Sequence, residues 1–449
     1  MAGDQVLKDL VAACPAARPA AGADAVAGVT PRYAASPASV AEASALLRAA
    51  AAHELSVVAR GSGSRMDWGA PPRRCDLVVG TSRLDQVVEH AAGDLVARVQ
   101  AGVSLASLAG VLAGAGQQLA LDQAPDGTGQ RPAATIGGTL ATGMAGPRRL
   151  RYGTPRDLVI GITVVRADGT VASSGGKVVK NVAGYDLGKL FAGSYGTLGL
   201  IVEAVFRLHP LPTAASYTTV STGGPGPARA AVAAAAASEL APVAIEVSRA
   251  ARDQPVQVGV LLEGDPSGLA ERSAALRELL GDGAATSEDA PGWWGRMEPP
   301  GGPGAPGGPR SPGTLVRVAF WAAALPRVLA AIDAAAAAVS ADPQLTGSAA
   351  SGVIYAALPA STSPGAAAGF VTGLREALAR GDADARPASA PFPDSPPVLA
   401  SAVVVHAPPP VAERVDLWGP VPGLPLMRAV KDQFDPGHRM APGRFAGGI

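Results

Sequence analysis

The feature that most constrains the fold of this chain is a glycine-rich run over residues 131–210. Glycines recur at short spacing in its segments ATIGGTLATG, RRLRYGTPRD and KNVAGYDLGKLFAGSYGTLGLIVEA. Because glycine adopts positive φ and has no Cβ, it is used where a backbone turns tightly or approaches a ligand closely. This spacing indicates several backbone segments around a flat or anionic ligand, and a buried nucleotide cofactor is the simplest such ligand.

Length and composition favour a neutral chain of two domains, with room for an extension. The 449 residues are 48% hydrophobic and 16% charged, which suffices for a sizeable core. Lys+Arg and Asp+Glu both number 37, so no overall basic field would attract nucleic acid or anionic lipid. Aromatic residues make up only 4%, which also disfavours the stacking platforms of nucleic-acid-binding proteins.

The cysteines and the first residues bear on the compartment. Cys14 and Cys75 are too few for a disulfide scaffold or a cysteine-ligated iron–sulfur cluster within the chain, so we expect free thiols in a reducing cytosol. Residues 1–10 lack the pattern of a signal peptide. Ala-rich runs such as 230–237 are too short to span a bilayer. A cytoplasmic location is therefore the expectation.

Hydrophobic periodicity in the first half predicts mixed helices and strands. Helices are expected over 39–54 and 104–115, and strands over 55–59, 76–79, 95–101 and 197–208. The segments 157–166 and 169–173 are predicted to form a β-hairpin, because the Asp168–Gly169 pair between them is a typical hairpin turn.

The second half predicts an antiparallel sheet covered by helices on one side, as in an α+β domain. Strand candidates lie at 243–247, 256–263, 316–321, 352–358 and 398–406, and helix candidates at 229–239, 267–280, 325–339 and 365–379. Residues 281–313 interrupt this pattern and end in EPPGGPGAPGGPRSPG, which predicts a disordered surface insertion. A short helix and a turn-rich tail are expected over 424–445.

The segment RGSGS (60–64) directly follows a predicted buried strand. Gly61 and Gly63 allow positive φ, so successive amides can converge into a nest for phosphate oxygens, and two serine hydroxyls add donors. An ordinary tight turn explains these residues equally well. No G-x-G-x-x-G opens a helix here, and SGGKVV (174–179) lacks the upstream glycine and the Ser or Thr of an ATPase phosphate loop.

The other glycine segments each allow a ligand-binding and a structural interpretation. ATIGG (134–138) begins a predicted helix whose first amides would be unpaired and suit a pyrophosphate, or it is a glycine-capped helix start. RYG with RD (151–157) would present backbone to a ring, or form a surface ion pair. GTLGLIVEA (196–204) would offer Gly199 and Ile201 main-chain groups to an adenine edge, or is a core strand.

In their order, these segments resemble a known family. RGxGS-like, xTIGGxxAxxxxG, RYGxxRD and GSxGTLGxI segments follow one another in the flavoproteins of the para-cresol methylhydroxylase / vanillyl-alcohol oxidase superfamily, where they surround one FAD. The resemblance covers 31–212, and the ending DP…PGR (435–444) is similar to the family's. KNVAGYDLGKLFAGSYGTLGLI resembles the glycolate oxidase / D-lactate dehydrogenase branch, above all the smaller FAD-binding subunits of bacterial glycolate oxidases.

This resemblance implies an α+β fold with a two-part FAD-binding domain and a cap domain that has an antiparallel sheet. The implied divisions are an N-terminal extension (1–30), the FAD-binding domain (31–212), the cap (213–410) and a C-terminal segment returning to the FAD domain (411–449). The segment 60–64 would hold the pyrophosphate, and residues 135–139, 142 and 143 would run beside pyrophosphate and isoalloxazine. Residues 153 and 157 would line the same channel, and residue 201 would meet adenine through its backbone. The implied FAD-binding residues are Arg60, Gly61, Ser62, Gly63, Ser64, Thr135, Ile136, Gly137, Gly138, Thr139, Thr142, Gly143, Gly153, Asp157 and Ile201.

The chain also departs from the family. Ser64 stands where members with covalently attached FAD often have a histidine, so we expect dissociable, non-covalent FAD. The HxGDGNxH and EHG segments that supply metal ligands and a base in the catalytic glycolate and D-lactate enzymes are missing. No metal is expected, and catalytic residues stay unassigned, because no pair of histidines has metal-ligand spacing among His53, His90, His209, His406 and His438.

The hypothesis that follows is an FAD-binding subunit of a glycolate oxidase-like complex, which oxidises a 2-hydroxy acid to a 2-oxo acid by hydride transfer to flavin N5. A second flavin subunit would carry metal and base, and an iron–sulfur subunit would take the electrons, with membrane association only through these partners. A self-sufficient FAD-linked oxidoreductase and a mainly structural flavin-fold subunit are the alternatives. Cations that could bind a substrate carboxylate, or instead FAD phosphates or a partner, are Lys177, Lys180, Arg148, Arg149 and Arg151.

Overall fold

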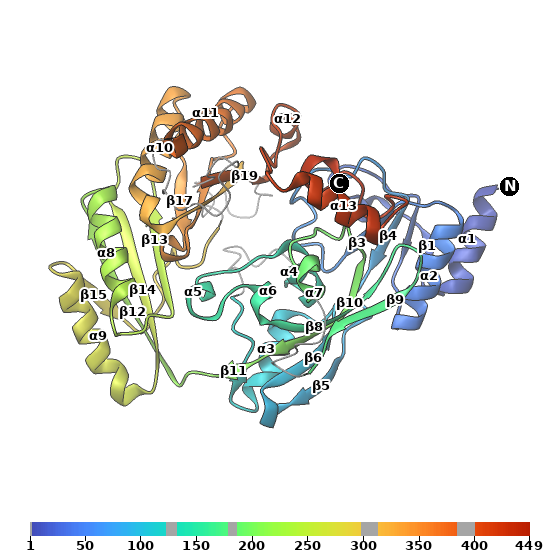
Figure 1. The fold of residues 1–449 in the computed structure, drawn as a ribbon, viewed down its shortest axis with the longest axis horizontal. Coiled ribbons are helices and arrows are strands. Elements are labelled where there is room, and N and C mark those ends of the chain that lie inside the picture. Colours follow the sequence, from blue (N-terminus) through green and yellow to red (C-terminus); the bar gives the residue numbers. More distant parts are fainter. Residues whose placement is uncertain (1, 123–132, 178–185, 298–312, 384–399) are drawn as a thin grey trace.

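The computed structural model of the chain describes residues 2–122, 133–177, 186–297, 313–383 and 400–449. Two bodies lie side by side (Figure 1). We call the described residues of 2–212 and 411–449 the base, and those of 213–410 the cap. The glycine-rich segments belong to the base and lie on the side that faces the cap (Figure 1).

A small four-stranded sheet opens the base, in the order β1 (Arg18–Pro19), β2 (Tyr33–Ala35), β4 (Leu77–Gly80) and β3 (Val57–Arg60). β2 and β3 each run parallel to β4. The predicted helix is confirmed as α2 (Val40–Ala52), which begins at Ser39, whose hydroxyl accepts a hydrogen bond from the amide of Glu42 at 3.1 Å. An unpredicted helix, α1 (Ala2–Ala13), packs on α2 and buries Leu10.

A five-stranded antiparallel sheet forms the rest of the base. Its order is β5 (Val87–Ala91), β6 (Val96–Gln100), β10 (Leu200–Arg207), β8 (Val159–Val165) and β9 (Val171–Gly175). The predicted hairpin is confirmed by the antiparallel pairing of β8 with β9. The short elements around the sheet are α3 (Leu105–Ala113), β7 (Gln117–Gln118), α4 (Ile136–Thr142), α5 (Arg149–Tyr152), α6 (Pro155–Leu158), α7 (Gly188–Phe191) and β11 (His209–Pro210).

The cap has the predicted antiparallel sheet, with eight strands instead of the five candidates. Its order is β15 (Ala285–Ser287), β12 (Ala214–Thr222), β14 (Val256–Gly264), β13 (Ala244–Arg249), β17 (Gln344–Gly347), β18 (Val353–Ala357), β16 (Leu315–Phe320) and β19 (Ala400–His406). One face is covered by α8 (Pro225–Ala237), α9 (Pro266–Leu280), α10 (Leu325–Ala338) and α11 (Pro364–Ala383), over a core that includes Val258 and Phe370 (Figure 1). β12, β15 and β17 were not predicted, because their small polar residues give no extended apolar run.

The predicted disordered insertion over 281–313 is wrong for its first part. Ala285–Ser287 forms β15 and pairs with β12, and Met297 is buried. Between them, the Trp294 ring packs edge-on against Tyr217 at a centroid distance of 5.1 Å. Aromatic and apolar side chains thus give 281–297 a surface to bury, whereas 298–312 lie outside the described residues.

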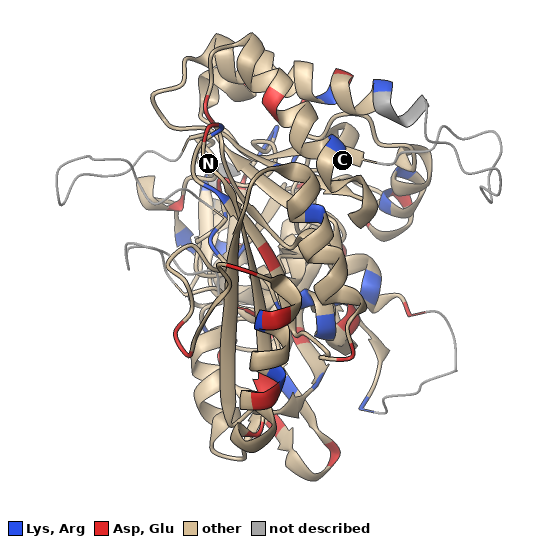
Figure 2. Cartoon of the chain, turned by 90° about the vertical axis from the view of Figure 1, so that its left-hand side faces the viewer, with Lys and Arg blue, Asp and Glu red and all other residues tan. Residues whose placement is uncertain are grey.

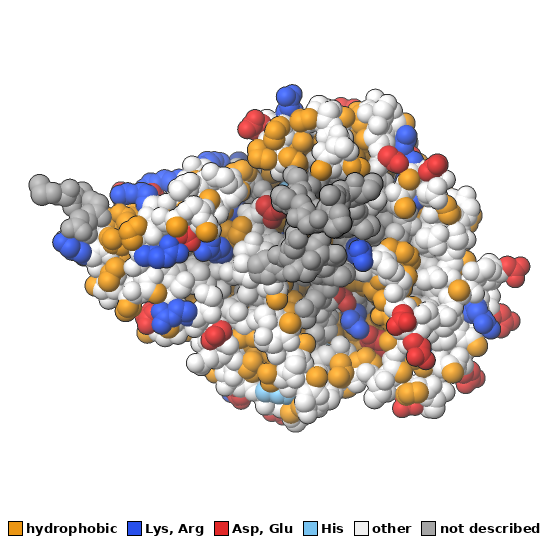
Figure 3. All heavy atoms as spheres, turned by 180° about the vertical axis from the view of Figure 1, so that it is seen from behind, with side chains coloured by type: hydrophobic (Ala, Val, Ile, Leu, Met, Phe, Trp, Pro, Cys, Tyr) orange, Lys and Arg blue, Asp and Glu red, His pale blue; other side chains and the backbone are white. Residues whose placement is uncertain are grey.

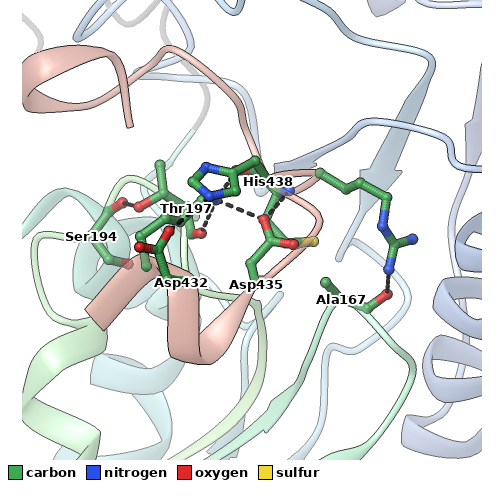
Figure 4. A network of polar contacts seen from close by, with 9 residues as sticks. Ala167, Ser194, Thr197, Asp432, Asp435 and His438 are labelled. Atoms are coloured by element: carbon green, nitrogen blue, oxygen red, sulfur yellow. Dashed lines mark hydrogen bonds and ion pairs between the residues drawn. The ribbon is translucent and has the colours of Figure 1, made fainter. Parts of the chain in front are cut away.

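The C-terminal segment returns to the base, where a buried lysine on α13 (Leu424–Phe434) fixes it; the short helix α12 (Pro409–Ala412) precedes it. The Lys431 side chain is 1% exposed. Its ammonium donates to the carbonyl oxygens of Thr197 (2.7 Å) and Met440 (2.9 Å) and to the carboxylate of Asp435 (2.7 Å), in the network of Figure 4. Every ammonium hydrogen therefore has an acceptor, which offsets the cost of burying the charge.

Charges of both signs are mixed along the chain. Figure 2 shows acidic and basic residues interspersed over the elements of the cap, and Figure 3 shows apolar side chains scattered among polar ones at the back of the molecule. In the described parts of the chain, no helix combines the length and the apolar character needed to cross a bilayer.

Replacing Lys431 with methionine should strongly destabilise the chain, because the buried carboxylate of Asp435 would lose its cation. Removing one member of a buried ion pair costs about 3–5 kcal/mol, and urea denaturation should show a loss of that size in the free energy of unfolding. Lys189→Met is the matched control, since Lys189 pairs with Asp186 at 3.0 Å on the surface, where such pairs contribute less than about 1 kcal/mol. Equal losses in both variants would contradict this account.

Candidate functional site

The two glycine loops predicted to hold a cofactor meet at one contact. β3 ends at Arg60, and the loop 61–64 packs against the start of α4, where Thr135 Oγ1 accepts a hydrogen bond from the amide of Gly138 at 3.2 Å. A Cβ on Gly61 would lie 2.2 Å from Thr135 Oγ1. Only glycine permits this approach, so the contact explains both motifs at once.

A pocket opens between these loops. Many of its lining residues were predicted, namely Gly61, Ser62, Gly63, Ser64, Thr135, Gly138, Thr139 and Thr142. The other described lining residues are Val58, Ala59, Arg65, Met66, Ala134, Ala141, Met144, Tyr195 and Arg444. Because the charged side chains among them, Arg65 and Arg444, are both basic, the pocket favours an anionic ligand.

The loop 61–64 supplies backbone donors to the pocket. The amides of Gly61, Ser62 and Gly63 donate to no acceptor among the described residues. Gly63 has φ +87°, which only glycine adopts without strain. Successive free amides in such a turn converge on one point and form a nest for an anion.

The expectation that the first amides of α4 are free for a phosphate is wrong. The amide of Ile136 donates to the carbonyl of Val103 at 2.9 Å, and that of Gly137 to the carbonyl of Ala101 at 2.8 Å. The third amide, that of Gly138, is used by the Thr135 cap. The segment after β6 therefore satisfies the start of α4, and the anion donors are those of the loop 61–64.

Arg60 lies beside the pocket, but its guanidinium is held elsewhere. It donates to the carbonyl of Ala23 at 3.0 Å and to Asp24 Oδ1 at 2.9 Å. Asp24 is buried, and hydrogen bonds from Arg18 and Arg60 hold its pKa well below its usual range. The side chain of Arg60 thus anchors the N-terminal extension to the loop.

Gly153 and Asp157 were predicted to line the FAD channel, but they lie outside the pocket lining. Gly153 has φ +84°. The carboxylate of Asp157 accepts hydrogen bonds from the amide (2.8 Å) and the hydroxyl (2.7 Å) of Thr154, which caps α6. Burial opposes ionisation, but these two hydrogen bonds lower the pKa of Asp157. Both residues therefore build the turn into α6.

The remaining predicted residues are not among the lining residues of the pocket. Ile136 is fully buried, and Gly137 packs so closely that a Cβ would lie 2.8 Å from that of Ala101. Gly143 ends α4 with φ +63°. Ile201 lies in β10 opposite Val164.

The structure also brings residues to the pocket that sequence reasoning missed. Arg444 donates to the carbonyls of Met66 (3.0 Å) and Trp68 (2.7 Å), which ties the C-terminal tail to the loop. Tyr195 has φ +55°, an uncommon conformation for a residue with a side chain, held by a hydrogen bond from its amide to the carbonyl of Ala141 at 2.8 Å. Arg444 lies in the family-like ending, which could have signalled it, whereas nothing marked Tyr195.

Three of the five cationic candidates for a substrate carboxylate are engaged in other contacts. Arg148 bridges the two bodies, since it donates to Asp122 of the base at 3.0 Å and to Glu263 of the cap at 2.9 Å. Arg149 donates to carbonyls of the segment that precedes α5. Lys177 forms an ion pair with Glu89, Arg151 is exposed, and Lys180 lies outside the described residues.

The histidines are dispersed, and each has a local neighbour. Within the described residues, no group of three or more His, Cys, Asp or Glu side chains could hold a metal ion. His406, at the end of β19, is the one that bridges cap and base, with its Nδ1 3.0 Å from Asp67 Oδ2. The others lie near these groups: His53 near Asp9, His90 near Gln117, His209 near Tyr152 and His438 near Asp432.

Known proteins that are similar in sequence support a cofactor-binding role for the pocket. Residues 31–175 match the family model of the FAD binding domain. Glycolate oxidase subunit GlcD of Bacillus subtilis is 39% identical over 171 residues, which are 38% of this chain and 35% of that protein. Glycolate oxidase subunit GlcE of Escherichia coli is 38% identical over 158 residues, 35% of this chain and 43% of that protein. The chain thus spans less than half the length of these relatives.

Solved structures confirm the predicted fold. P-cresol methylhydroxylase with substrate bound aligns over 98% of this chain and 96% of that chain, with a TM-score of 0.72 at 13% identity. An alkyldihydroxyacetonephosphate synthase aligns over 92% and 76%, with a TM-score of 0.64 at 16% identity. The α+β fold with an antiparallel cap sheet is therefore that of the p-cresol methylhydroxylase type.

FAD, the ligand of the matched domain family, suits the donors of the pocket. FAD carries an anionic pyrophosphate, and the pocket offers the amides of residues 61–63, which have no acceptor among the described residues, together with two arginines in its lining. Two further lining groups, Thr139 Oγ1 and Arg444 Nη1, are buried and have no hydrogen-bond partner among the described residues. Since buried polar groups are normally paired, these atoms indicate a polar ligand in the pocket.

Glu246 on β13 should make the stability of the chain depend on pH. Burial raises its pKa from 4.5 to about 8, although a hydrogen bond from Ser348 and the nearby charge of Arg149 act the other way. The folded state therefore binds this proton more tightly, so its stabilising contribution is complete below about pH 4.5 and is lost as pH rises to about 8. Glu246→Gln should unfold like the wild type at pH 5 and be more stable at pH 8.5, by on the order of 3 kcal/mol.

Urea denaturation at both pH values tests this expectation. Glu271→Gln on the exposed face of α9 is the matched control and should change neither value. If the free energies of unfolding of Glu246→Gln and the wild type differ by the same amount at pH 5 and at pH 8.5, Glu246 does not carry the buried proton.

Gly61→Ala should weaken FAD binding by about tenfold or more, because overpacking of this kind costs about 1–3 kcal/mol. The added Cβ would push the loop off Thr135 and spoil the converging amides. FAD content after purification and the dissociation constant from fluorescence titration measure the effect. Gly93→Ala is the control, since a Cβ there meets nothing within 4 Å, and Gly61→Ala/Thr135→Ala should recover part of the loss. Full FAD content in Gly61→Ala would show that the contact is dispensable.

Proposed function

Because residues 31–175 form an FAD-binding domain, we propose that this chain is the FAD-binding subunit of a glycolate oxidase-like complex that oxidises a 2-hydroxy acid to a 2-oxo acid. The observation that carries the proposal is the pocket between the loop 61–64 and Thr135, with its free amides and its two arginines. The glycolate oxidase subunits and the D-lactate and D-2-hydroxyglutarate dehydrogenases among the relatives support the substrate class.

The residues of this chain would bind the cofactor and shield it. The loop 61–64 and Arg444 would hold the anionic part of FAD, and Thr139 would donate to or accept from it. Between cap and pocket, Trp68, Met144 and Tyr355 form an apolar cluster that would exclude water. Bound FAD would supply the hydride acceptor for C2 of the acid.

The proton acceptor for the substrate hydroxyl is the reason for proposing a complex. A general base must lie within hydrogen-bond reach of that hydroxyl. The charged groups among the described lining residues are arginines, which stay protonated and cannot act as bases. We therefore assign the base, and any metal, to a partner flavin subunit, and the onward electron transfer to an iron–sulfur subunit. The complex would act in the cytoplasm or at the inner face of the membrane.

One observation favours the self-sufficient alternative. His406 lies 3.0 Å from Asp67, one residue beyond the pocket-lining Met66. A carboxylate that orients a histidine is a common arrangement for a general base. In that case His406 would take the proton of the substrate hydroxyl, and the chain would need no partner subunit for the chemistry.

Anaerobic reduction of the flavin separates these functions. The chain is purified alone and with its co-expressed partners, and bleaching of the flavin absorbance is followed after addition of glycolate or D-lactate. We expect a yellow chain that bleaches only with the partners. Bleaching of the isolated chain that disappears in His406→Gln would support self-sufficiency, and a colourless chain that cannot be reconstituted with FAD would leave the structural role. Acid precipitation should release the flavin, because we propose non-covalent FAD with Ser64 at the position of attachment.

A further inference from the structure

An arginine in the middle of the cap sheet faces the base. Arg317 lies on β16, where its cross-strand neighbours are Tyr355 on β18 and Val403 on β19. Its sequence neighbours Val316 and Val318 are buried in the core beneath the cap helices. Because successive side chains of a strand point to opposite faces, Arg317 projects from the uncovered face of the sheet. That face is turned toward the base (Figure 1).

The guanidinium of Arg317 has no hydrogen bond or ion pair with any described residue. Its side chain is half-buried, in a strand that is otherwise apolar. Two other arginines of the cap and its border are paired, since the buried Arg249 binds Asp333 and the half-buried Arg148 binds Glu263. A partly desolvated charge without an acceptor is costly, so the position of Arg317 indicates that an anion belongs beside it.

Arg317 also lies next to the pocket. Leu315 and Tyr355, on the same face of the sheet, pack in one cluster with Trp68 and Met144, and Met144 lines the pocket. The lining residue Tyr195 packs against this cluster. Burial raises the pKa of the Tyr195 phenol, while the positive charge of Arg317 acts against that rise. Since Arg317 is the cross-strand neighbour of Tyr355, which belongs to this cluster, it lies at the cap side of the pocket.

We propose that Arg317 binds the carboxylate of the substrate, a small 2-hydroxy acid, at the cap side of the flavin pocket. The proposal rests on the proposed function. A guanidinium presents parallel N–H groups that match both oxygens of a carboxylate, which fixes the orientation of the acid as well as its charge. The phosphates of FAD have their own donors in the loop 61–64 of the base, whereas Arg317 approaches from the opposite body. The cap thus selects acids over neutral alcohols.

Oxalate binding to the FAD-loaded full chain tests this inference without turnover. Oxalate has carboxylates but no C–H bond to oxidise, and it is titrated by calorimetry and by the flavin difference spectrum. Arg317→Met should weaken oxalate binding by about tenfold to a hundredfold, the usual loss for a charge-assisted hydrogen-bond pair. Arg317→Lys should bind oxalate more tightly than Arg317→Met and more weakly than the wild type, because it keeps the charge without the paired donors. Arg229→Met, exposed on α8, should bind oxalate like the wild type.

FAD content and melting temperature show whether each variant is folded. If Arg317→Met is not folded, oxalate binding by Arg317→Lys tests the inference in its place. The inference is overturned if oxalate binds the wild type no better than Arg317→Met, or not at all. In the complex with its partners, Arg317→Met should raise KM for glycolate more than it lowers kcat. If acids reduce the flavin with an unchanged KM, the proposed function stands and the Arg317 site fails. If oxalate binding depends on Arg317 but no 2-hydroxy acid reduces the flavin, the anion site stands and the proposed function fails.

Discussion

The close approach of Gly61 to Thr135 is the contact on which the rest of the site depends. Thr135 caps α4, and the loop that follows β3 lies directly against this cap because Gly61 has no side chain. The start of α4 is in turn satisfied by carbonyls beyond β6. The small mixed sheet and the larger antiparallel sheet are thereby joined at one point. The amides of residues 61–63, which donate to no acceptor among the described residues, are held in place by this junction.

Two polar anchors hold distant parts of the chain around that junction. Lys431 connects the C-terminal helix α13 to the carbonyl of Thr197, three residues before β10, and Arg148 connects the base to Glu263 of the cap. Lys431 is a buried charge and Arg148 a half-buried one, and the donors of each are matched by specific acceptors, so each fixes a geometry as well as contributing energy. Arg444 then reaches the pocket from a tail that is positioned by the first of these anchors.

The charged groups around the pocket come from both the base and the cap. The base supplies amides and arginines suited to a phosphate-bearing cofactor, while the cap adds Arg317 from the opposite side. Most other buried charges near the boundary are neutralised within the chain. Under the proposed function, the anionic groups of cofactor and substrate would complete the electrostatics of this region, and a partner would contribute the group that takes a proton.

The sequence by itself determined many of the elements and the type of fold. The helix after Ser39, the hairpin at Asp168 and the apolar strands of the cap follow from local periodicity and turn chemistry, which act over a few residues. The glycine motifs also identified the two loops that meet at the pocket. The sequence did not reveal β12 or β15, because their pairing depends on neighbours far along the chain.

Only the tertiary structure decided which groups face the pocket and which already form hydrogen bonds or ion pairs within the chain. The first amides of α4 looked free, but acceptors from another segment take them. Asp157, expected beside the FAD channel, caps its own helix, and Arg148, a candidate for binding a carboxylate, a phosphate or a partner, is held by two carboxylates. Arg317 drew no attention in the sequence and yet projects toward the site. A local pattern specifies what a residue can bind, whereas long-range packing determines whether that capacity is already satisfied.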